Sequence, residues 1–578
     1  MLAGLDWLVI LGYFGLLAAV VMFTKRKQET GEDFFLGGRS VGWLAIGASI
    51  FAANIGSEHL IGLAGSGAVC GLSQSHWEFH AWVLILMSWV FLPFYYNSGV
   101  STMPEFLERR FGAKARWILS LVSLAAYVLT KISVTVYAGA LFFEVMMPEV
   151  NLTVGGTTVS SFWIGAIATV TLAGIYSSFG GLTAVVYTDL VQTFIILAGT
   201  LAVTGFAFHY LGHSGVALAD GSTAQSITDG WQVLKATIKS TGNVEQFGLW
   251  HSLSHKAFPW LGVVVASVTI GVWYWCTDQF IIQRTLSAKN LTNARRGAIW
   301  GGFLKLSPVF LFLVPGMLGF ALHHNQIAVN GSAFAIPLKE SGALNGDAVF
   351  PTLVRTLLPI GFRGLVVAGM IAALMSSLAS LFNSVSTLFT VDVYQKLKPE
   401  TSQKALVRIG RLTTISMTAL GIIWVPIMKA IAGGGLYQYI QSVQSFLAPP
   451  IVAVFVLGLF WKRMNLRGAV WGLGLGFALG MAKLAVNAVW GGEAGFALIQ
   501  DFYFSGLLLA ASIAIVICAS LSAPPPDPAH LTGLNFACLD AEYRRKNRAS
   551  WNWADVVASC VVVGLVVCAY IYFWTWLD

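Results

Sequence analysis

The chain has 578 residues, of which 56% are hydrophobic and 10% are charged, and its formal net charge is +8 at pH 7. So few polar residues cannot cover a water-soluble protein of this length, which excludes a soluble globular fold and indicates an integral membrane protein. The basic residues lie in short segments between apolar runs, a distribution that argues against a nucleic-acid partner.

Apolar runs long enough to cross a bilayer core of about 30 Å follow one another along almost the whole chain. Backbone groups find no water in hydrocarbon, and the runs do not alternate as barrel strands do, so we predict an all-α integral membrane protein. The first run has no small-residue cleavage site, so we expect it to be retained as a helix. The predicted spans number about fourteen and cover residues 3–23, 41–65, 79–97, 117–147, 160–178, 183–210, 257–283, 297–322, 356–394, 412–432, 438–461, 468–490, 502–522 and 553–577.

Basic residues concentrate on one side of the predicted membrane, where alternate loops hold 24 of the 34 lysines and arginines. Loops rich in Lys and Arg stay on the cytoplasmic side, and the number of spans is even, so we expect both termini outside the cell in a multi-pass plasma-membrane protein. The basic segments are 25–39, which includes Lys25, Arg26 and Lys27, and 109–116, 284–296, 396–411, 462–467 and 544–548.

The loops carry few other signals. The two long outer segments, 211–256 and 323–355, show no strand pattern and are expected to cover an outer vestibule. Asn151 and Asn330 begin N-glycosylation sequons on the same side. The proline-rich segment 524–528 predicts a stiff inner linker. The six cysteines lack metal-type spacing, so we expect no disulfide and no metal cluster.

Four ionisable residues fall inside predicted spans, where each charge is expensive and needs a partner or a function. Glu78 opens the third span, and Lys131 lies midway along the fourth. Asp189 lies near the start of the sixth span, and Lys305 lies within the eighth. A structural salt bridge or a side chain that reaches the interface would also explain them, so position alone leaves their roles open.

Two spans carry glycine and polar residues where a lipid-facing helix should be apolar. They are residues 52–59 in the second span and residues 271–279 in the seventh. Secondary transporters place substrate and ion sites at such helix breaks, and a spacing of five spans indicates two inverted repeats. The aromatic rings of the second segment suit the apolar faces of a sugar ring, although an aromatic cluster is also common packing.

The ninth span carries a face of small and hydroxyl residues at positions 373, 376, 377 and 380. Carbonyl and hydroxyl oxygens suit a hard cation such as sodium, and a neutral set of oxygens binds it weakly enough to release it. Serine in a membrane helix also commonly bonds its own backbone, so this face alone does not establish an ion site.

Together these segments resemble the sodium/solute symporter family, and within it the sodium/glucose cotransporters. The segments that carry the resemblance are 34–39, 54–65, 103–106, 180–182 with 187–189, 273–284, 382–384, 449–450 and 461–463. The resemblance implies a five-plus-five inverted-repeat, LeuT-like core with alternating access around a central site. It implies the divisions 1–40 for an extra helix, 41–210 and 257–465 for the two repeats, 211–256 for an outer loop and 466–578 for peripheral helices.

The resemblance also assigns the binding residues of this chain. The implied sugar-binding residues are Asn54, His59, Glu78, Tyr274, Trp275, Lys305 and Gln441, with Tyr274 as an inner gate. The implied sodium ligands are the carbonyls of Ala52, Ile55 and Ala373 and the hydroxyls of Ser376 and Ser377. Asp189 stands where the family has an acid below that site, on the exit path of the ion. Each sugar-site side chain is chemically apt, because together they offer both donors and acceptors to hydroxyl groups.

Two departures from the family pattern matter. Ala53 and Ala379 replace hydroxyls that hold a second sodium in some members, so we expect one sodium per sugar. Gly271 replaces a side chain that lines the sugar pocket in relatives, which leaves the sugar preference less defined.

The sequence therefore predicts sodium-coupled uptake of a hexose of the glucose or galactose type, by a monomer or weak oligomer in the lipid bilayer, and no enzymatic activity. A symporter of the same fold for an amino acid, sialic acid, a vitamin or an anion is the nearest alternative. A proton-driven carrier with Asp189 or Glu78 as its relay is another. A membrane sensor or enzyme is disfavoured because neither a signalling domain nor a nucleophile–base or metal-ligand spacing is found.

Overall fold

The computed structural model describes residues 2–24, 30–56, 58–154, 157–218, 220–431, 436–490 and 498–578. The basic cluster Lys25, Arg26 and Lys27 lies outside the described residues, as does Ser57 in the interrupted second span.

Helices make up nearly all of the regular structure, with short 3-10 or π segments labelled η. The first half contains α1 (Gly4–Thr24), α2 (Gly31–Leu36), η1 (Gly37–Arg39), α3 (Trp43–Asn54), η2 (Glu58–Leu63), α4 (Ala64–Cys70), α5 (Ser75–Glu78), α6 (Ala81–Leu86), η3 (Met87–Phe91), α7 (Leu92–Ser98), α8 (Met103–Phe111), α9 (Ala113–Ala126), η4 (Tyr127–Ile132), α10 (Ser133–Met146), β1 (Leu152–Val154), β2 (Thr157–Val159), α11 (Ser161–Gly212), α12 (Asp229–Ser240), α13 (Val244–Phe247), α14 (Trp260–Gly271), η5 (Val272–Thr277) and α15 (Gln279–Leu286). The second half contains α16 (Leu291–Leu304), η6 (Val309–Leu313), α17 (Val314–His324), β3 (Ala328–Val329), β4 (Ser332–Ala333), η7 (Gly346–Ala348), α18 (Val349–Leu357), α19 (Phe362–Thr387), η8 (Leu388–Tyr394), α20 (Gln395–Leu397), α21 (Gln403–Ile431), α22 (Leu436–Phe460), α23 (Leu466–Trp490), α24 (Asp501–Leu521), η10 (Pro528–Leu531), η11 (Phe536–Cys538), α25 (Ala541–Ala549) and α26 (Trp553–Trp574).

The predicted helical membrane protein is confirmed. Among the described residues, 11 helices are long and apolar enough to cross a membrane, or up to 12 if the bent pair Trp43–Asn54 and Glu58–Cys70 counts as one span. Shorter apolar helices at Val134–Met146 and Ser161–Ile175 fall in two further predicted spans. The fifth and sixth predicted spans join in α11, which breaks at Gly181 where φ is 58°. Only glycine adopts that conformation at little cost.

Both predicted interruptions are confirmed. Helix α3 ends at Asn54, Ile55 leaves the helical region at φ −82° and ψ 86°, and the following helix is turned by 59°. In the seventh predicted span, α14 passes into the π segment η5, and Asp278 is extended at φ −82° and ψ 128° before α15 begins. Each break frees backbone groups from helical hydrogen bonds in the middle of an apolar span.

The expectation that the outer segment 323–355 lacks strands is wrong. Strands β3 and β4 form an antiparallel hairpin in which Val329 pairs with Ser332. Asn330 and Gly331 make its two-residue turn with φ of 51° and 86°, the conformation that Asn-Gly favours in tight hairpins. Helices α12, α13 and α18 give the outer segments further regular structure. A second hairpin pairs β1 with β2.

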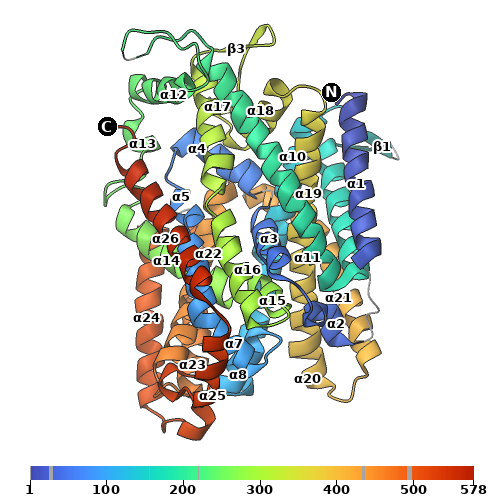
Figure 1. Ribbon diagram of the computed structural model, residues 1–578, viewed down its shortest axis with the longest axis vertical. Helices are drawn as coiled ribbons and strands as arrows, with labels where there is room; N and C mark the ends of the chain where they lie inside the picture. Colours follow the sequence, from blue (N-terminus) through green and yellow to red (C-terminus); the bar gives the residue numbers. More distant parts are fainter. Residues whose placement is uncertain are drawn as a thin grey trace.

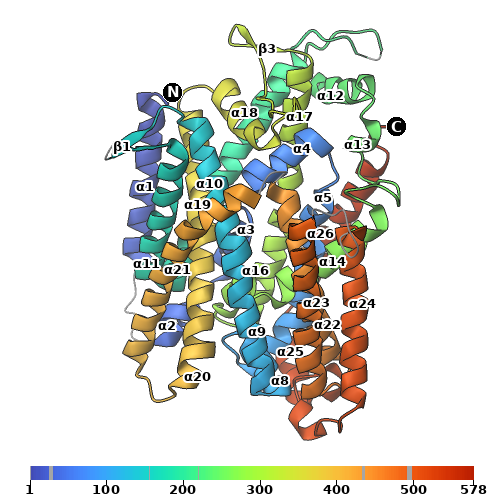
Figure 2. The same cartoon turned by 180° about the vertical axis from the view of Figure 1, so that it is seen from behind.

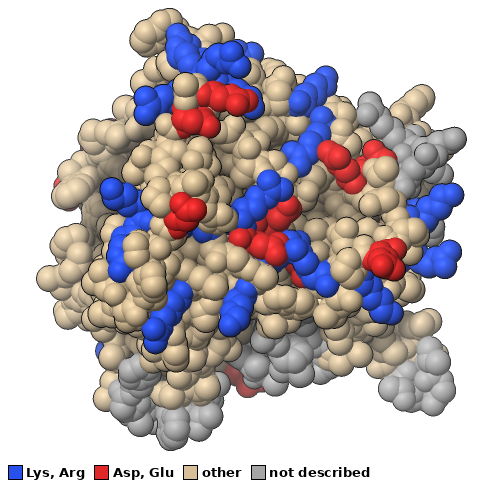
Figure 3. Space-filling view, turned by 90° about the horizontal axis from the view of Figure 1, so that it is seen from below, with Lys and Arg blue, Asp and Glu red and all other residues tan. Residues whose placement is uncertain are grey.

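The long helices run roughly parallel to the long axis of the molecule (Figure 1). Helices α1, α11, α19 and α21 lie on one side, and α22, α23, α24 and α26 lie on the other, as the reverse view also shows (Figure 2). The α12 helix and β3 lie at one end, and α8, α20 and α25 lie at the opposite end. Seen from that opposite end, lysine and arginine side chains are spread over the surface and outnumber the acidic ones (Figure 3).

Candidate functional site

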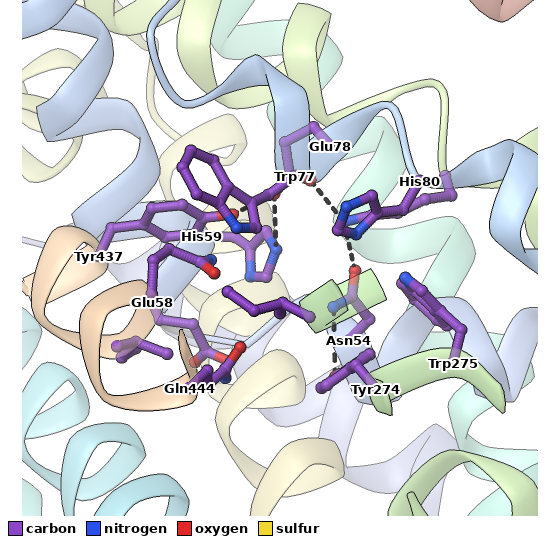
Figure 4. Close-up of a pocket in the computed structure, with 14 residues that line it drawn as sticks. Asn54, Glu58, His59, Trp77, Glu78, His80, Tyr274, Trp275, Tyr437 and Gln444 are labelled. Atoms are coloured by element: carbon purple, nitrogen blue, oxygen red, sulfur yellow. Dashed lines mark hydrogen bonds and ion pairs between the residues drawn. The ribbon is translucent and has the colours of Figure 1, made fainter. Parts of the chain in front are cut away.

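The two broken helices meet at a small buried cavity of about 50 Å³ (Figure 4). The helix break in the second span, the short helix α5, the π segment η5, the end of α16 and the start of α22 supply its walls. All seven residues predicted for the sugar site line this cavity. The lining residues are Asn54, Glu58, His59, Trp77, Glu78, His80, Ile270, Tyr274, Trp275, Lys305, Tyr437, Ile440, Gln441 and Gln444.

A chain of hydrogen bonds crosses the cavity between the two breaks. Lys305 Nζ, just past the end of α16, donates to Glu78 Oε2 at 2.6 Å and to Asn54 Oδ1 at 2.7 Å. Asn54 Nδ2 then donates to the Tyr274 hydroxyl at 3.2 Å. Asn54 occupies this position because α3 ends there, and Tyr274 because η5 replaces regular helix. The breaks thus bring polar side chains from separate spans into one network.

The second oxygen of Glu78 faces α22 and the π segment η2, which follows the first break. The Tyr437 hydroxyl donates to Glu78 Oε1, and His59 Nε2 lies 3.4 Å from the same oxygen. The imidazole of His59 stands edge-on to the Tyr437 ring at 5.6 Å between centroids. Glu78 is therefore satisfied on both oxygens by groups that a ligand hydroxyl can replace.

Several buried polar atoms of the lining residues have no hydrogen-bond partner within the described part of the chain. They are the acceptor Glu58 Oε2, the ring nitrogen His59 Nδ1, and the indole donors Trp77 Nε1 and Trp275 Nε1. Native proteins leave few such atoms, because an unpaired buried polar group is costly. A mixed set of donors and acceptors between aromatic rings suits a ligand that offers both hydroxyls and apolar C–H faces.

Gly271 is one of the two departures from the family pattern, and a neighbouring side chain occupies the space beside it. A Cβ built at Gly271 would lie 3.1 Å from His80 Nε2, so the imidazole takes the space beside this glycine. His80 Nε2 is in turn 2.9 Å from Ser267 Oγ, which fixes the ring at the cavity wall. His80 thus contributes to the wall at the place where the sequence indicates a missing side chain.

The predicted sodium ligands lie at the end of α3 and on α19, two helices that pack against each other. Ser377 Oγ donates to the Ala53 carbonyl at 3.4 Å, so its hydroxyl lies at the α3 terminus. Ser376 Oγ instead donates to Asp189 Oδ1 at 2.6 Å. The remaining predicted ligands, Ala52, Ile55 and Ala373, are all buried.

Asp189 connects the region of the predicted sodium ligands to Arg284 of α15. Its Oδ2 accepts a hydrogen bond from Ser49 Oγ at 2.5 Å and lies 3.9 Å from Arg284 Nε. Arg284 Nε also donates to Ser49 Oγ at 3.0 Å. Since Ser376 holds the other carboxylate oxygen, Asp189 lies directly beside one predicted sodium ligand.

Lys131 forms a salt bridge, which is one of the roles that its position in the span left open. Its Nζ lies 2.5 Å from Asp278 Oδ2 and 4.5 Å from the centre of the Tyr274 ring. Lys131 also lines a second small cavity, of about 40 Å³, together with Glu58, Tyr274 and Ser377. This ion pair anchors the extended residue of the second helix break.

Seven lining residues were absent from the predicted site: Glu58, Trp77, His80, Ile270, Tyr437, Ile440 and Gln444. Glu58 lies inside the interrupted segment 52–59, where its charge was the available signal. Trp77 and His80 flank Glu78 within one turn of chain. Tyr437 and Gln444 share the α22 face of Gln441, since each is three or four residues from it.

Comparison with known proteins gives consistent matches. The model of the sodium:solute symporter family matches residues 34–476. The chain is 37% identical over 545 residues to sodium/glucose cotransporter 4 of Danio rerio, covering 92% of this chain and 80% of the relative. It is 39% identical over 561 residues to sodium/glucose cotransporter 2 of Rattus norvegicus, covering 94% and 82%. Sodium/myo-inositol cotransporter 2 of Homo sapiens is 38% identical over 495 residues, with 84% and 70% covered.

Among solved structures, a Na+-coupled sialic acid symporter in a substrate-bound outward-open state superposes with a TM-score of 0.70. The superposition covers 91% of this chain and 99% of the symporter, at 19% identity. The two proteins therefore share a fold.

Proposed function

Because this chain belongs to the sodium:solute symporter family and is a transporter rather than an enzyme, we propose that it carries a hexose of the glucose or galactose type into the cell with sodium, by alternating access. The observation that supports this most directly is the central cavity. There the Glu78–Lys305–Asn54–Tyr274 chain stands beside unpaired donors and acceptors and the Trp275 ring. Such a lining can bind a cyclic polyol, because its polar groups bond the hydroxyls at the edge of the solute ring and its aromatic rings pack against the apolar face.

The cavity is smaller than typical ligand pockets of about 300–1,000 Å³. Binding of a hexose therefore requires the lining side chains to separate. The hydroxyls of the sugar would then replace contacts that Glu78, Lys305 and Asn54 now make with one another. Gln441 and His59 would add a donor and an acceptor at the α22 wall, and Tyr274 would close the cavity from below.

A second candidate solute is myo-inositol, since one relative is a sodium/myo-inositol cotransporter. Inositol is also a ring of hydroxyls with apolar faces, so it suits the same lining. It differs from a hexose in lacking the ring oxygen and the hydroxymethyl arm, which gives a direct test by competition.

Sodium would bind where α19 meets the end of α3. The Ala52, Ile55 and Ala373 carbonyls and the Ser376 and Ser377 hydroxyls would supply its oxygens, and Asp189 would lie on its path to the cell interior. The 3.4 Å contact between Ser377 Oγ and the Ala53 carbonyl supports this proposal, because the hydroxyl lies beside the helix break. One sodium per sugar follows, because Ala53 and Ala379 offer no side-chain oxygen.

The proposed architecture has fourteen spans around a five-plus-five inverted-repeat core, with repeats at 41–210 and 257–465. Residues 1–40, 211–256 and 466–578 would be the extra helix, outer loop and peripheral helices. Both termini would lie outside the plasma membrane, because the end of the molecule bearing α8, α20 and α25 is rich in lysine and arginine (Figure 3). A monomer or weak oligomer suffices, since the cavity is built within one chain.

The test is uptake of labelled sugars into sealed vesicles that contain the protein, under sodium, potassium or proton gradients. We expect uptake of glucose or galactose that depends on an inward sodium gradient and moves charge. Uptake driven equally by a proton gradient without sodium would favour the proton-carrier alternative. Sodium-driven uptake of inositol but of no hexose would select the second candidate.

A further inference from the structure

The central cavity contains a second carboxylate, Glu58, which the sugar and sodium sites do not use. Its Oε2 is buried and has no hydrogen-bond partner within the described residues. Glu58 lines both small cavities, the one that contains Lys305 and the one that contains Lys131 and Ser377. Glycine at position 56 leaves room for it, because a Cβ there would lie 2.2 Å from Glu58 Oε2.

The lysine and carboxylate side chains around the two cavities are unequal in number. Lys305 pairs with Glu78 at 2.6 Å, and Lys131 pairs with Asp278 at 2.5 Å. Each ammonium group thus has its own carboxylate within contact distance, and Glu58 is the third carboxylate. His59 and Lys131 lie near enough to act on Glu58 electrostatically, but within the described residues neither bonds its Oε2. A buried carboxylate oxygen that receives no hydrogen bond is costly, and a ligand that donates to it removes that cost.

Glu58 and Glu78 stand apart in the cavity. Figure 4 shows Glu78 beside Trp77 and Glu58 at the opposite side of the drawn residues, toward Gln444. Both Glu58 and Gln444 belong to the linings of the two cavities. A ring that bonds Glu78 and Lys305 at one edge would therefore present a different edge to Glu58.

We propose that Glu58 binds the ammonium group of an amino sugar, so that the cavity takes a protonated amino-deoxyhexose in addition to a neutral hexose. A protonated amine supplies a positive charge beside Glu58 and up to three N–H donors for its unbonded oxygen. Charge-assisted hydrogen bonds of this kind are about twice as strong as neutral ones. The inference rests on the proposed sugar transport and adds to it a class of substrate and the residue that selects it.

The test is inhibition of sodium-driven labelled glucose uptake in vesicles, at a pH where the amine is protonated. The inhibitors are 2-amino-2-deoxyglucose, 3-amino-3-deoxyglucose and 6-amino-6-deoxyglucose, each measured beside the matching deoxyglucose, which lacks both the amine and the hydroxyl. In the wild type we expect at least one amino sugar to inhibit roughly tenfold or more strongly than its deoxy counterpart. The position of that amine identifies the ring edge that faces Glu58.

The variants separate charge from shape. Glu58→Gln should remove the preference for the amino sugar over its deoxy counterpart, and Glu58→Asp, which keeps the charge, should retain part of it. Glu245→Gln, at an exposed carboxylate in α13, should leave the preference unchanged. A labelled form of the preferred amino sugar should also carry one more positive charge per molecule than glucose.

Three results would overturn the inference. The wild type could show no preference for any amine over its deoxy counterpart, a result that needs no variant to fold. The preference could persist in Glu58→Gln. Finally, Glu58→Gln could raise the sodium concentration for half-maximal uptake and leave the amine preference unchanged, which would assign Glu58 to the ion. Absence of sodium-driven glucose uptake in the wild type would instead contradict the proposed function itself.

Discussion

Lys305 Nζ and Glu78 Oε2 lie 2.6 Å apart in the middle of the molecule, where the two residues are 2% and 0% exposed. Two charges at such a depth persist only when further hydrogen bonds satisfy them. Here Lys305 also donates to Asn54, and Glu78 also accepts from the Tyr437 hydroxyl. The pair is thus held by side chains from α3 and α22, and it lines the cavity in which we place the sugar.

Replacement of Glu78 by glutamine should weaken sugar binding more than it weakens folding. Glutamine keeps the shape and one acceptor oxygen but loses the charge that strengthens hydrogen bonds from sugar hydroxyls. A hydrogen bond to a charged group contributes on the order of 1.5–3 kcal/mol, so sugar affinity should fall by roughly ten- to a hundredfold. The measurement is inhibition of uptake by a panel of deoxyglucoses, in wild type and in Glu78→Gln.

The deoxyglucose panel separates a binding role from a structural one. A sugar that already lacks the hydroxyl bonded to Glu78 should lose little further affinity in the variant. Sodium binding without sugar should persist, because the proposed ion ligands lie on other segments. Equal losses for every analogue, or loss of sodium binding, would make Glu78 a structural partner of Lys305.

The helix breaks and the core of the proposed sugar site were predictable because they violate the composition of a membrane helix. Asn54, Glu78 and Lys305 are costly in hydrocarbon, so each had to have a partner or a ligand, and the structure brings all three together. The extended Asp278 also fell inside the predicted second interruption. Order along the chain, combined with the family resemblance, gave the remaining members His59, Tyr274, Trp275 and Gln441.

Other features depend on contacts between distant segments, which local sequence does not encode. Tyr437 opens a helix as an ordinary aromatic residue, and its bond to Glu78 joins positions 359 residues apart. The sequence around His80 indicates only the start of a helix. It does not indicate that the His80 ring packs against Gly271. The hydroxyl of Ser376 donates to Asp189, which lies 187 positions earlier in the chain. The residue pattern on α19 gives no indication of this partner. The Asn330-Gly331 turn, by contrast, carried a local signal, and the β3–β4 hairpin was missed because its strands are only two residues long.

Removal of the Ser377 hydroxyl should raise the sodium concentration needed for half-maximal uptake and leave sugar specificity nearly unchanged. The reason is that Ser377 Oγ lies at the α3 terminus, 3.4 Å from the Ala53 carbonyl, and not among the residues around Lys305. The measurement is the sodium dependence of uptake in Ser377→Ala.

Ser384→Ala on the same helix is the matched control for this variant. The Ser384 hydroxyl donates to the Ser380 carbonyl one turn back, at 2.9 Å, so its loss should not alter the sodium dependence. An unchanged sodium dependence in Ser377→Ala would remove Ser377 from the ion site.

Transport of a neutral hexose should move one sodium and one net charge per molecule. A second ion would need side-chain oxygens at positions 53 and 379, which are both alanine. The carbonyl of Ala379 is already bonded by Ser177 Oγ at 3.2 Å. Simultaneous measurement of current and labelled glucose uptake gives the ratio directly, and a reproducible value near two would contradict the single-ion site.

Replacement of Asp189 by asparagine should slow transport without a matching loss of sugar affinity. Asp189 accepts hydrogen bonds from Ser49 and Ser376 on its two oxygens, and the Arg284 guanidinium lies 3.9 Å away. Asparagine offers one acceptor and one donor, so one serine loses its acceptor, and the negative charge that offsets Arg284 disappears. A sodium ion that leaves past Ser376 would then meet a positive side chain with no carboxylate beside it.

The expected result for Asp189→Asn is a maximal uptake rate that falls by roughly tenfold or more, since each increase of about 1.4 kcal/mol in a barrier slows a step tenfold. The sugar concentration for half-maximal uptake should change little, because Asp189 is not among the residues that line the sugar cavity. Asp220→Asn in the outer segment, where the carboxylate is exposed, controls for the loss of one acidic residue. Kinetics of uptake at saturating sodium and at saturating sugar separate the two parameters.

A loss of sugar affinity at an unchanged maximal rate would show that Asp189 supports the sugar-binding residues and does not act on the ion path. Full activity at all sodium concentrations would show that the Ser376 hydroxyl and the Arg284 guanidinium can pass the ion without the carboxylate.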